Sequence, residues 1–384
     1  MKVLVVGAGM AGLTYSILAA RRGNDVTVCE RNTRVGRKVA MSGNGKCNIG
    51  NMHISANAYN APVFVQKILD VVSVEKYLDF LRSAGIYTYA DESGRLYPVT
   101  DSASSVVDVL RFEAARLGVK ILTDTEIVKI DVQGKFVAET RDGQKVYCDK
   151  VIVACGSKSQ ADETNLASLV GRQYLTAMSP SLTPVRVKNM NGTLNGVRNR
   201  AKVTLFADGT KVAEEHGEVQ FKDYGLSGVC VFNLSALIAR DIVRGEKHEY
   251  KFVVDVVPDI EESDLTKIIA KNIACGHEDP LVGLVKNRVA EYVKKQQKTA
   301  SDDIAKAYAH MVKNLTFIFD KLLDYSLSQV TAGGVNLAFV DDETLCLPNG
   351  ISVLGEALDV DGQCGGFNLQ FAASSALYLF DGKL

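Results

Sequence analysis

The chain has 384 residues, of which 47% are hydrophobic, and this is enough for two or three domains with ordinary cores. Its 44 basic and 45 acidic side chains nearly cancel, so no global charge marks it for nucleic acid or an anionic membrane. Eight cysteines are scattered without the short spacings of zinc or dithiol motifs, which argues against a metal site and a redox-active dithiol.

The first thirty residues predict a β-strand, a helix and a second β-strand. Residues 3–6 form an apolar strand-like run, 11–22 have a helical pattern that ends at Gly23, and 25–29 match a second strand. The run 3–20 is largely apolar, but its regular glycines favour this soluble unit over a membrane span. Because no secretory pattern precedes the first strand, we expect a cytoplasmic protein with reduced thiols and no membrane partner.

The following segments predict a loop, two helices and several short strands. Residues 36–51 contain four glycines and are expected to form a loop with special backbone angles. Helices are predicted over 64–83 and 103–117. The expected short strands are 119–123, 127–132, 136–140, 145–148 and 150–154. The last of these is rich in β-branched residues and suits a buried central strand.

After about residue 165 the pattern changes. The segments with a strand pattern are 185–187, 201–206, 211–214 and 250–257. Residues 261–314 are helical and charged, without strand signals. From residue 329 the glycines return, and an apolar helix is expected over 368–380. The simplest arrangement is one α/β domain that is split between the two ends, with β and helical insertions between them.

A six-residue glycine fingerprint, Gly7-Ala-Gly9-Met-Ala-Gly12, follows the first predicted strand and opens the first helix. Gly7 permits the tight turn, Gly9 lets the backbone approach a pyrophosphate, and Gly12 lets the helix pack closely on the strand. The helix N-terminus presents N–H groups and partial positive charge to that pyrophosphate. Glu30, at the end of the second strand, suits the ribose hydroxyls and disfavours NADP. The pattern predicts dinucleotide binding; a glycine-rich turn of an unrelated α/β protein is the simpler alternative.

The residues after Glu30 favour FAD over NAD. They continue into the glycine-rich stretches 36–38 and 42–48, which an NAD enzyme does not need. A flavin ring lies beyond the pyrophosphate and requires such a wall for its flat face. Arg37 and Lys38 are cationic and suited to neutralising phosphate.

Five groups of motifs resemble those of the aminoacetone-oxidase-like, or BaiN-like, FAD-binding flavoproteins, within the glutathione-reductase-type FAD fold. In chain order they are Gly7 to Gly12 with Glu30; Gly36 to Lys38 with Ser42 to Asn48; Gly94 to Pro98; Tyr224 to Gly228; and Val330 to Val335 with Gly355 to Gly362 and Gly365 to Asn368. Together they extend over nearly the whole chain.

The resemblance implies an α/β fold in which a split Rossmann-like FAD-binding domain carries inserted β-barrel-like and small helical modules. The expected domains are 1–165 plus 330–384 for FAD, 166–258 plus about 315–329 for the β-rich substrate domain, and 259–314 for the helical insert. It also implies non-covalent FAD contacts at Gly7, Gly9, Gly12, Glu30, Arg37, Lys38, Ser42, Gly43, Val128, Gly156, Gly355, Glu356, Gly366, Asn368 and Leu369, with Val128 on the adenine side through its backbone.

The C-terminal glycine motif also indicates a flavin site on physical grounds, independently of the resemblance. Gly365-Gly366 directly before a helix predicts a donor-rich helix N-terminus, suited to the N1/O2 edge of a flavin, where negative charge gathers on reduction. A plain loop before a terminal helix is the alternative. Among the nearby carboxylates we favour Glu356, because it follows Gly355 after a short apolar strand.

The sequence also departs from the family. Lys46 stands where arginine is usual, Gly50 where threonine is usual, Lys222-Asp223 in place of Thr-His, and Val229 in place of proline. In the family the insert-domain loop lines the active site, so these changes put substrate identity in question rather than FAD binding.

Two reaction classes fit a flavoprotein of this kind. In the first, a small organic substrate such as an amine or alcohol exchanges hydride with FAD, and an external partner carries the electrons onward. In the second, external NAD(P)H reduces FAD, which then reduces a carbon–carbon double bond; the family resemblance suggests a steroid-like substrate or uracil in RNA. A single fingerprint predicts no built-in NAD(P)H domain. A non-catalytic flavin-binding protein is the third alternative.

Three residues are candidates for catalysis. Lys46 and Cys47, on the loop expected over the flavin ring, suit the proton donor that reduction of a double bond requires. Cys47 is equally consistent with a packing thiol. Tyr224 is a further candidate, although a tyrosine in a β-rich insert more often belongs to the core. The five histidines lie outside the motifs and are expected at structural or surface positions.

A small-molecule substrate is favoured over RNA. The helical insert carries basic residues interleaved with Glu291 and Tyr292, and a solvated helix face explains them more simply than an RNA site. The basic residues are Lys286, Arg288, Lys294, Lys295 and Lys298.

Overall fold

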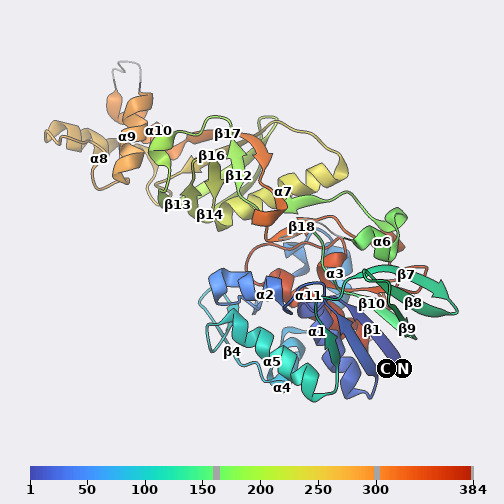
Figure 1. The fold of residues 1–384 in the computed structure, drawn as a ribbon. Coiled ribbons are helices and arrows are strands. Elements are labelled where there is room, and N and C mark those ends of the chain that lie inside the picture. Colours follow the sequence, from blue (N-terminus) through green and yellow to red (C-terminus); the bar gives the residue numbers. More distant parts are fainter. Residues whose placement is uncertain (159–164, 298–302, 382–384) are drawn as a thin grey trace. The chain divides into compact units, whose positions relative to one another are not determined.

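The computed structural model describes residues 1–158, 165–297 and 303–381. The chain forms two compact units, Met1–Ser179 with Val330–Leu384 and Pro180–Gln329, which are coloured along the sequence in Figure 1. The three-module division expected from the sequence, with the helical insert as a module of its own, remains a proposal. No helix in the described ranges is both long and apolar enough to cross a membrane.

A parallel five-stranded sheet forms the centre of the first unit, in the order β19-β10-β1-β2-β6. β1 (Lys2–Val6) lies between β10 (Lys150–Val153) and β2 (Asp25–Cys29), with β6 (Lys120–Leu122) and β19 (Ser352–Val353) at the edges. The apolar runs of the inner strands are buried, as expected for a sheet covered on both faces. Because β19 comes from the C-terminal part of the chain, the predicted split α/β fold is confirmed.

Helices from both ends of the chain pack together in the first unit. α1 (Met10–Arg21) packs against α5 (Ala103–Arg116) and α11 (Phe367–Asp381). Tyr15 of α1 meets Phe380 of α11 edge to face, with ring centroids 6.5 Å apart. The first and last helices of the chain therefore share one core.

Two expectations for this unit were wrong in detail. Residues 37–41, expected as loop, form the short helix α2 (Arg37–Met41), although Gly36 before it has a φ of 65°. The single helix expected over 64–83 is two helices, α3 (Pro62–Val71) and α4 (Val74–Ala84). The break occurs where Ser73 adopts an extended conformation and its hydroxyl accepts the Lys76 N–H at 3.3 Å, which is a helix N-cap.

Two small antiparallel sheets and a short helix complete this unit. One sheet has the order β3-β5-β4 and the other β7-β8-β9. Their strands are β3 (Gly50–Asn51), β4 (Thr88–Ala90), β5 (Arg95–Pro98), β7 (Ile127–Gln133), β8 (Lys135–Thr140) and β9 (Lys145–Cys148). The helix is α6 (Leu166–Val170). The chain leaves this unit through β11 (Ser179–Ser181) and returns through β18 (Val330–Ala332).

The second unit contains a closed six-stranded barrel, so the predicted barrel-like insert is confirmed. Its strands in barrel order are β12 (Val185–Val187), β15 (Gly225–Ser227), β14 (Thr210–Phe221), β13 (Arg198–Ala207), β16 (Tyr250–Asp255) and β17 (Leu315–Leu322). Phe221, Phe252 and Phe317 are fully buried inside this unit. The sequence analysis missed α7 (Val229–Arg244), whose buried face includes Leu234 and Ile238.

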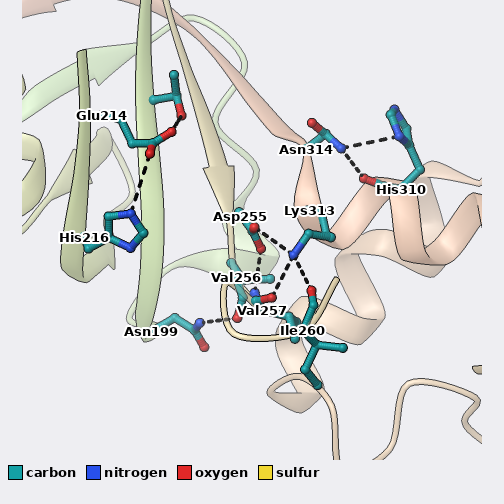
Figure 2. A network of polar contacts seen from close by, with 11 residues as sticks. Asn199, Glu214, His216, Asp255, Val256, Val257, Ile260, His310, Lys313 and Asn314 are labelled. Carbon is teal, nitrogen blue, oxygen red and sulfur yellow. Dashed lines mark hydrogen bonds and ion pairs between the residues drawn. The ribbon is translucent and has the colours of Figure 1, made fainter. Parts of the chain in front are cut away.

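Three helices, α8 (Glu262–Ala274), α9 (Asn287–Gln296) and α10 (Ile304–Lys313), form the predicted helical insert within the second unit. A buried ion pair joins its last helix to the barrel (Figure 2). Lys313 Nζ lies 2.9 Å from the Asp255 carboxylate and also donates to the carbonyl oxygens of Val257 and Ile260. Because the Asp255 side chain is only 4% exposed, this contact anchors α10 at the end of β16.

Candidate functional site

The glycine fingerprint forms a tight turn between β1 and α1. Gly7 has a φ of 103°, and a Cβ at this position would lie 2.6 Å from the carbonyl oxygen of Ala154. A Cβ at Gly12 would lie 2.0 Å from the Gly7 carbonyl oxygen. Both positions therefore require glycine for the close packing of strand, turn and helix, as the sequence predicts.

Gly9 differs from the other two fingerprint glycines because it faces open space. No atom lies within 4 Å of the position of an added Cβ. Gly9 is the N-cap of α1, so the first N–H groups of the helix point past it without intrahelical partners. The open space in front of Gly9 is the cradle, and a methyl group added at Gly9 would project into it. Because the cradle lies at a helix N-terminus, it fits the diphosphate of a dinucleotide.

Glu30 is buried at the end of β2, with 8% of its surface exposed. Its Oε2 accepts the Ala8 N–H at 2.9 Å, and its Oε1 accepts the backbone and side-chain N–H groups of Asn32 at 2.9 and 2.6 Å. The carboxylate thus ties the fingerprint turn to the end of β2. Its contact with a ribose stays a prediction.

An ion pair connects the two halves of the predicted FAD site. Lys38 Nζ lies 3.0 Å from Glu356 Oε2, and the Ser157 hydroxyl donates to Glu356 Oε1 at 2.6 Å. A Cβ at Gly156 would lie 3.4 Å from Lys38 Nζ. Gly355, with a φ of 62°, brings its backbone close to Ala11 of the fingerprint helix. The structure therefore brings these predicted residues together, and Ser157 is a partner that the sequence analysis did not single out.

The loop after α2 has the special backbone angles that its glycines predict. Gly43 and Cys47 have φ values of 57° and 58°. A Cβ at Gly43 would approach the backbone nitrogen of Asn48 to 2.8 Å, and the Ser42 hydroxyl donates to the Val39 carbonyl at 2.7 Å. Arg37, the first residue of α2, is exposed to solvent.

Val128 lies in an irregularity of the small β7-β8-β9 sheet. The register of the two strands shifts between Ile127 and Lys129, so Val128 is the extra residue of a β-bulge. The backbone of a bulged residue is not committed to the ladder, and this is compatible with the expected backbone contact to an adenine.

The C-terminal glycines pack against residues 48–51, which include strand β3. A Cβ at Gly366 would lie 2.2 Å from the carbonyl oxygen of Gly50. The Asn368 side chain accepts the Gly362 N–H at 2.8 Å and donates to the Gly362 carbonyl at 2.9 Å, while Leu369 is half-buried. The structure thus assigns Gly366 and Asn368 roles in holding the start of α11, and their contact with a flavin stays a prediction.

The three catalytic candidates have different surroundings. Cys47 is 0% exposed, and burial raises the pKa of its thiol, so the thiol is protonated at neutral pH. Lys46 is 60% exposed and pairs with Asp101 at 3.7 Å. Tyr224 belongs to the second unit, where burial followed by the Asp223 charge raises the pKa of its phenol. Lys46 and Cys47 are consecutive residues of one loop in the first unit, and Tyr224 lies in the second unit.

Several histidines pair with carboxylates on the surface of the second unit. His216 lies 3.6 Å from Glu214, and His310 lies 3.2 Å from Glu262. His248 Nδ1 lies 2.7 Å from Asp208. These exposed pairs agree with the surface role expected of these histidines.

The basic residues of the helical insert fall into two groups. Lys294 and Lys295 pair with Asp279 and Glu291, at 2.8 and 2.5 Å. Lys286 and Arg288 instead donate to the backbone carbonyls of Arg198 and Asn195, beside a hollow of about 600 Å³. Lys298 lies outside the described residues. The lining of the hollow is Gly196, Val197, Arg198, Lys286, Asn287 and Arg288.

Comparison with known proteins agrees with this site over nearly the whole chain. Residues 1–379 match the HI0933-like protein Rossmann domain. The chain is 31% identical to the 3-dehydro-bile acid delta(4,6)-reductase of Clostridium scindens, over 97% of this chain and 96% of that protein. It is 26% identical to the ribosomal RNA dihydrouridine synthases of Haemophilus influenzae and Escherichia coli, over 97% of this chain and 96% and 95% of theirs.

The family match, the split parallel sheet and the glycine cradle agree with one another. The chain therefore belongs to the HI0933-like Rossmann family, the aminoacetone-oxidase-like or BaiN-like flavoproteins, and is an FAD-dependent oxidoreductase.

Proposed function

We propose that this oxidoreductase reduces a carbon–carbon double bond that is conjugated to a carbonyl group. One observation carries the proposal: full-length relatives are named for this chemistry on unrelated molecules. A 3-dehydro-delta(4) bile acid contains an enone, and formation of dihydrouridine saturates the C5=C6 bond that is conjugated to C4=O in uracil. The reacting groups are alike although the molecules are not.

The described residues fit the cofactor that this reaction needs. Bound FAD supplies the transfer of hydride. Gly9 and the N-terminus of α1 would hold its diphosphate, and Glu30 its ribose, on the geometry described above. Lys38 and Glu356 form an ion pair beside Gly156 and suit the next part of the cofactor.

Electrons are proposed to come from free NADH or NADPH. The sequence contains a single glycine fingerprint, and none of the eight cysteines forms a disulfide in the described ranges, so neither a second nucleotide-binding domain nor a disulfide supports an internal relay. An external pyridine nucleotide that reduces the flavin and leaves is the simplest donor. A flavin oxidase acting on a small amine or alcohol is the competing reading, and it predicts the opposite direction of hydride transfer.

Uridine in RNA is a second candidate substrate, and the hollow beside α9 is the observation that favours it. Lys286 and Arg288 donate there to neutral carbonyl oxygens, whereas Lys294 and Lys295 pair with carboxylates. Phosphate groups of an RNA backbone would be attracted to such a surface. Binding through phosphates should weaken steeply between about 50 and 200 mM salt. An RNA affinity that does not change over this range of salt concentration would contradict the RNA-substrate hypothesis.

Anaerobic spectroscopy tests the proposal. The FAD-loaded protein is mixed with NADH or NADPH, and flavin absorbance near about 450 nm is followed. We expect bleaching by one nucleotide, then recovery of the absorbance on anaerobic addition of an enone, 4-androstene-3,17-dione, or of a uridine-containing ribosomal RNA fragment. A saturated steroid ketone is the matched control and should not restore the colour.

The competing oxidase gives a different result in the same apparatus. Its flavin would be bleached by amines or alcohols and would release peroxide when air is admitted. Bleaching by these donors, with no response to either double bond, would overturn the proposed reduction.

A further inference from the structure

The sheet β3-β5-β4 has one buried and one open face. Leu96 and Pro98 of β5 point inward and are buried. On the other face Tyr89 and Tyr97 stand directly opposite each other in the register, with ring centroids 5.9 Å apart and planes 29° apart. Tyr89 is 42% exposed, so an aromatic pair that usually prefers burial faces solvent here.

Asp101 connects this aromatic pair with the loop that carries Lys46. Its Oδ1 accepts the Tyr89 hydroxyl at 2.6 Å, and its Oδ2 lies 3.7 Å from Lys46 Nζ. The hydrogen bond and the nearby Asp101 charge raise the pKa of Tyr89, so its phenol stays neutral and donating at physiological pH. A single carboxylate therefore accepts the hydrogen bond of a phenol and pairs with an ammonium group.

The backbone at Asp101 is in an unusual conformation. Its φ is 47°, in the left-handed region that non-glycine residues seldom adopt. An exposed ion pair contributes only about 0–1 kcal/mol to stability. The pair with Lys46 therefore offsets little of the free energy that the left-handed conformation of Asp101 costs. Strained residues in such positions often hold a functional group in place.

We propose that Asp101 and Tyr89 are positioning residues, which hold the Lys46 ammonium where it binds the carbonyl oxygen of the substrate. The inference rests on the proposed function. As hydride adds to the β-carbon of the conjugated double bond, negative charge moves to that oxygen, and a held cation stabilises it. The face of Tyr89 and Tyr97 beside it suits the planar ring to which the carbonyl belongs.

The chemistry balances without a proton from Lys46. The hydride, which carries both electrons, comes from the reduced pyridine nucleotide by way of the flavin, and the nucleotide leaves oxidised. The β-carbon gains the hydride, and the α-carbon gains a proton from solvent as the enolate becomes the saturated ketone. Lys46 remains an ammonium group throughout, so its role is to bind charge.

Asp101→Asn is the decisive variant. Asparagine tolerates the left-handed conformation, and its Oδ1 can still accept the Tyr89 hydroxyl, so only the charge facing Lys46 is lost. With 4-androstene-3,17-dione and ribosomal RNA as probes, we expect kcat/KM to fall about twofold to fivefold for the probe that is reduced, the effect of losing one exposed ion pair. Asp101→Glu should recover part of the loss.

A second readout follows Lys46 itself. Trypsin cleaves after lysine, and Asp101→Asn should speed cleavage between Lys46 and Cys47, detected by mass spectrometry of the native protein. Asp131→Asn is the matched control, because it removes an exposed partner of Lys129 at 2.7 Å in a different sheet. It should change neither kcat/KM nor this cleavage.

The outcomes separate the two proposals. Wild-type protein that reduces neither probe would reject the proposed function and this inference with it. Wild-type activity combined with unchanged kinetics, or with unchanged cleavage after Lys46, in Asp101→Asn would reject the positioning role alone.

Discussion

At the scale of single residues, Gly9 and Gly12 have different tasks in the same motif. Gly12 allows the helix to pack closely on the strand, and Gly9 leaves space for the diphosphate. Gly12 has the Gly7 carbonyl oxygen 2.0 Å from the position of an added Cβ, whereas Gly9 has no neighbour within 4 Å. Gly9 also has a φ of −85°, which alanine readily adopts. We expect Gly9→Ala to fold normally but to lose FAD, and Gly12→Ala to unfold at a lower temperature even without FAD.

Thermal unfolding of the FAD-free variants and their flavin absorbance after reconstitution measure both effects. Gly23→Ala is a useful control, since its Cβ would also meet no neighbour but its φ of 77° adds strain far from the cradle. A Gly9→Ala protein that retains FAD like the wild type would contradict the assignment of the cradle.

Buried thiols predict how stability depends on pH. Burial raises the pKa of Cys29, Cys148 and Cys230 from 9.0 to about 11. Because these thiols hold their protons more tightly in the folded protein, the stability they contribute is fully present below about pH 9 and is lost as the pH rises toward about 11. We expect the melting temperature to fall over this interval. Cys230→Ala should flatten part of the fall, and a melting temperature that stays constant across the same interval would contradict the prediction.

The geometry of the glycine turn and of Glu30 could be predicted from sequence, whereas the side chains that pair with the other predicted site residues could not. Gly7, Gly12 and Glu30 have fixed spacings that follow from the geometry of a strand, a turn and a helix. Ser157 and Asp101 occur in no such spacing, because their partners Glu356 and Lys46 are distant in the chain and meet them only in the folded protein. The glycine-containing turn at 155–157 was the available signal for Ser157.

At the scale of elements, the ion pair of Lys313 and Asp255 joins the last helix of the insert to the barrel (Figure 2). The Lys313 side chain is 13% exposed and Asp255 is 4% exposed, so removal of the cation leaves a buried, uncompensated carboxylate. We expect Lys313→Met to lower the free energy of unfolding by about 3–5 kcal/mol. Chemical denaturation of the purified protein measures the change.

Arg200→Met provides the matched control for this pair. Arg200 lies 3.4 Å from Asp259 in the same unit, but the two side chains are 78% and 67% exposed. Loss of such a surface pair should cost about 0–1 kcal/mol. Equal effects of the two substitutions would show that burial does not govern the strength of the Lys313 contact.

Elements were predicted best where a local pattern decides them. β1 and β2 are short apolar strands beside glycine turns, and the structure forms them within a residue of the expected bounds. α7 was missed because its sixteen residues lie between expected strands of a β-rich region, and no element was assigned to them. α2 was missed because glycines surround it; the αL conformation of Gly36 starts the helix rather than preventing it.

At the scale of the whole molecule, both ends of the chain form the first unit. β19 and α11 belong to the unit that begins with β1 and α1, and the second unit is inserted between them. Sequence could predict the split α/β fold because the glycine motifs lie at both ends. The closure of the barrel could not be predicted from sequence. It depends on pairing between β12 and β17, which are more than a hundred residues apart in the chain.

The two units each have their own buried core, and this predicts how FAD changes unfolding. A ligand bound only by the folded first unit should stabilise that unit by about 2.7 kcal/mol at a concentration about one hundred times its Kd. We therefore expect calorimetry to resolve two transitions, of which FAD raises one. Lys38→Met should reduce that shift by removing the partner of Glu356, whereas Lys313→Met should lower the other transition. A single transition that FAD and both substitutions move together would mean that the units unfold as one, and the independence inferred from their separate cores would be wrong.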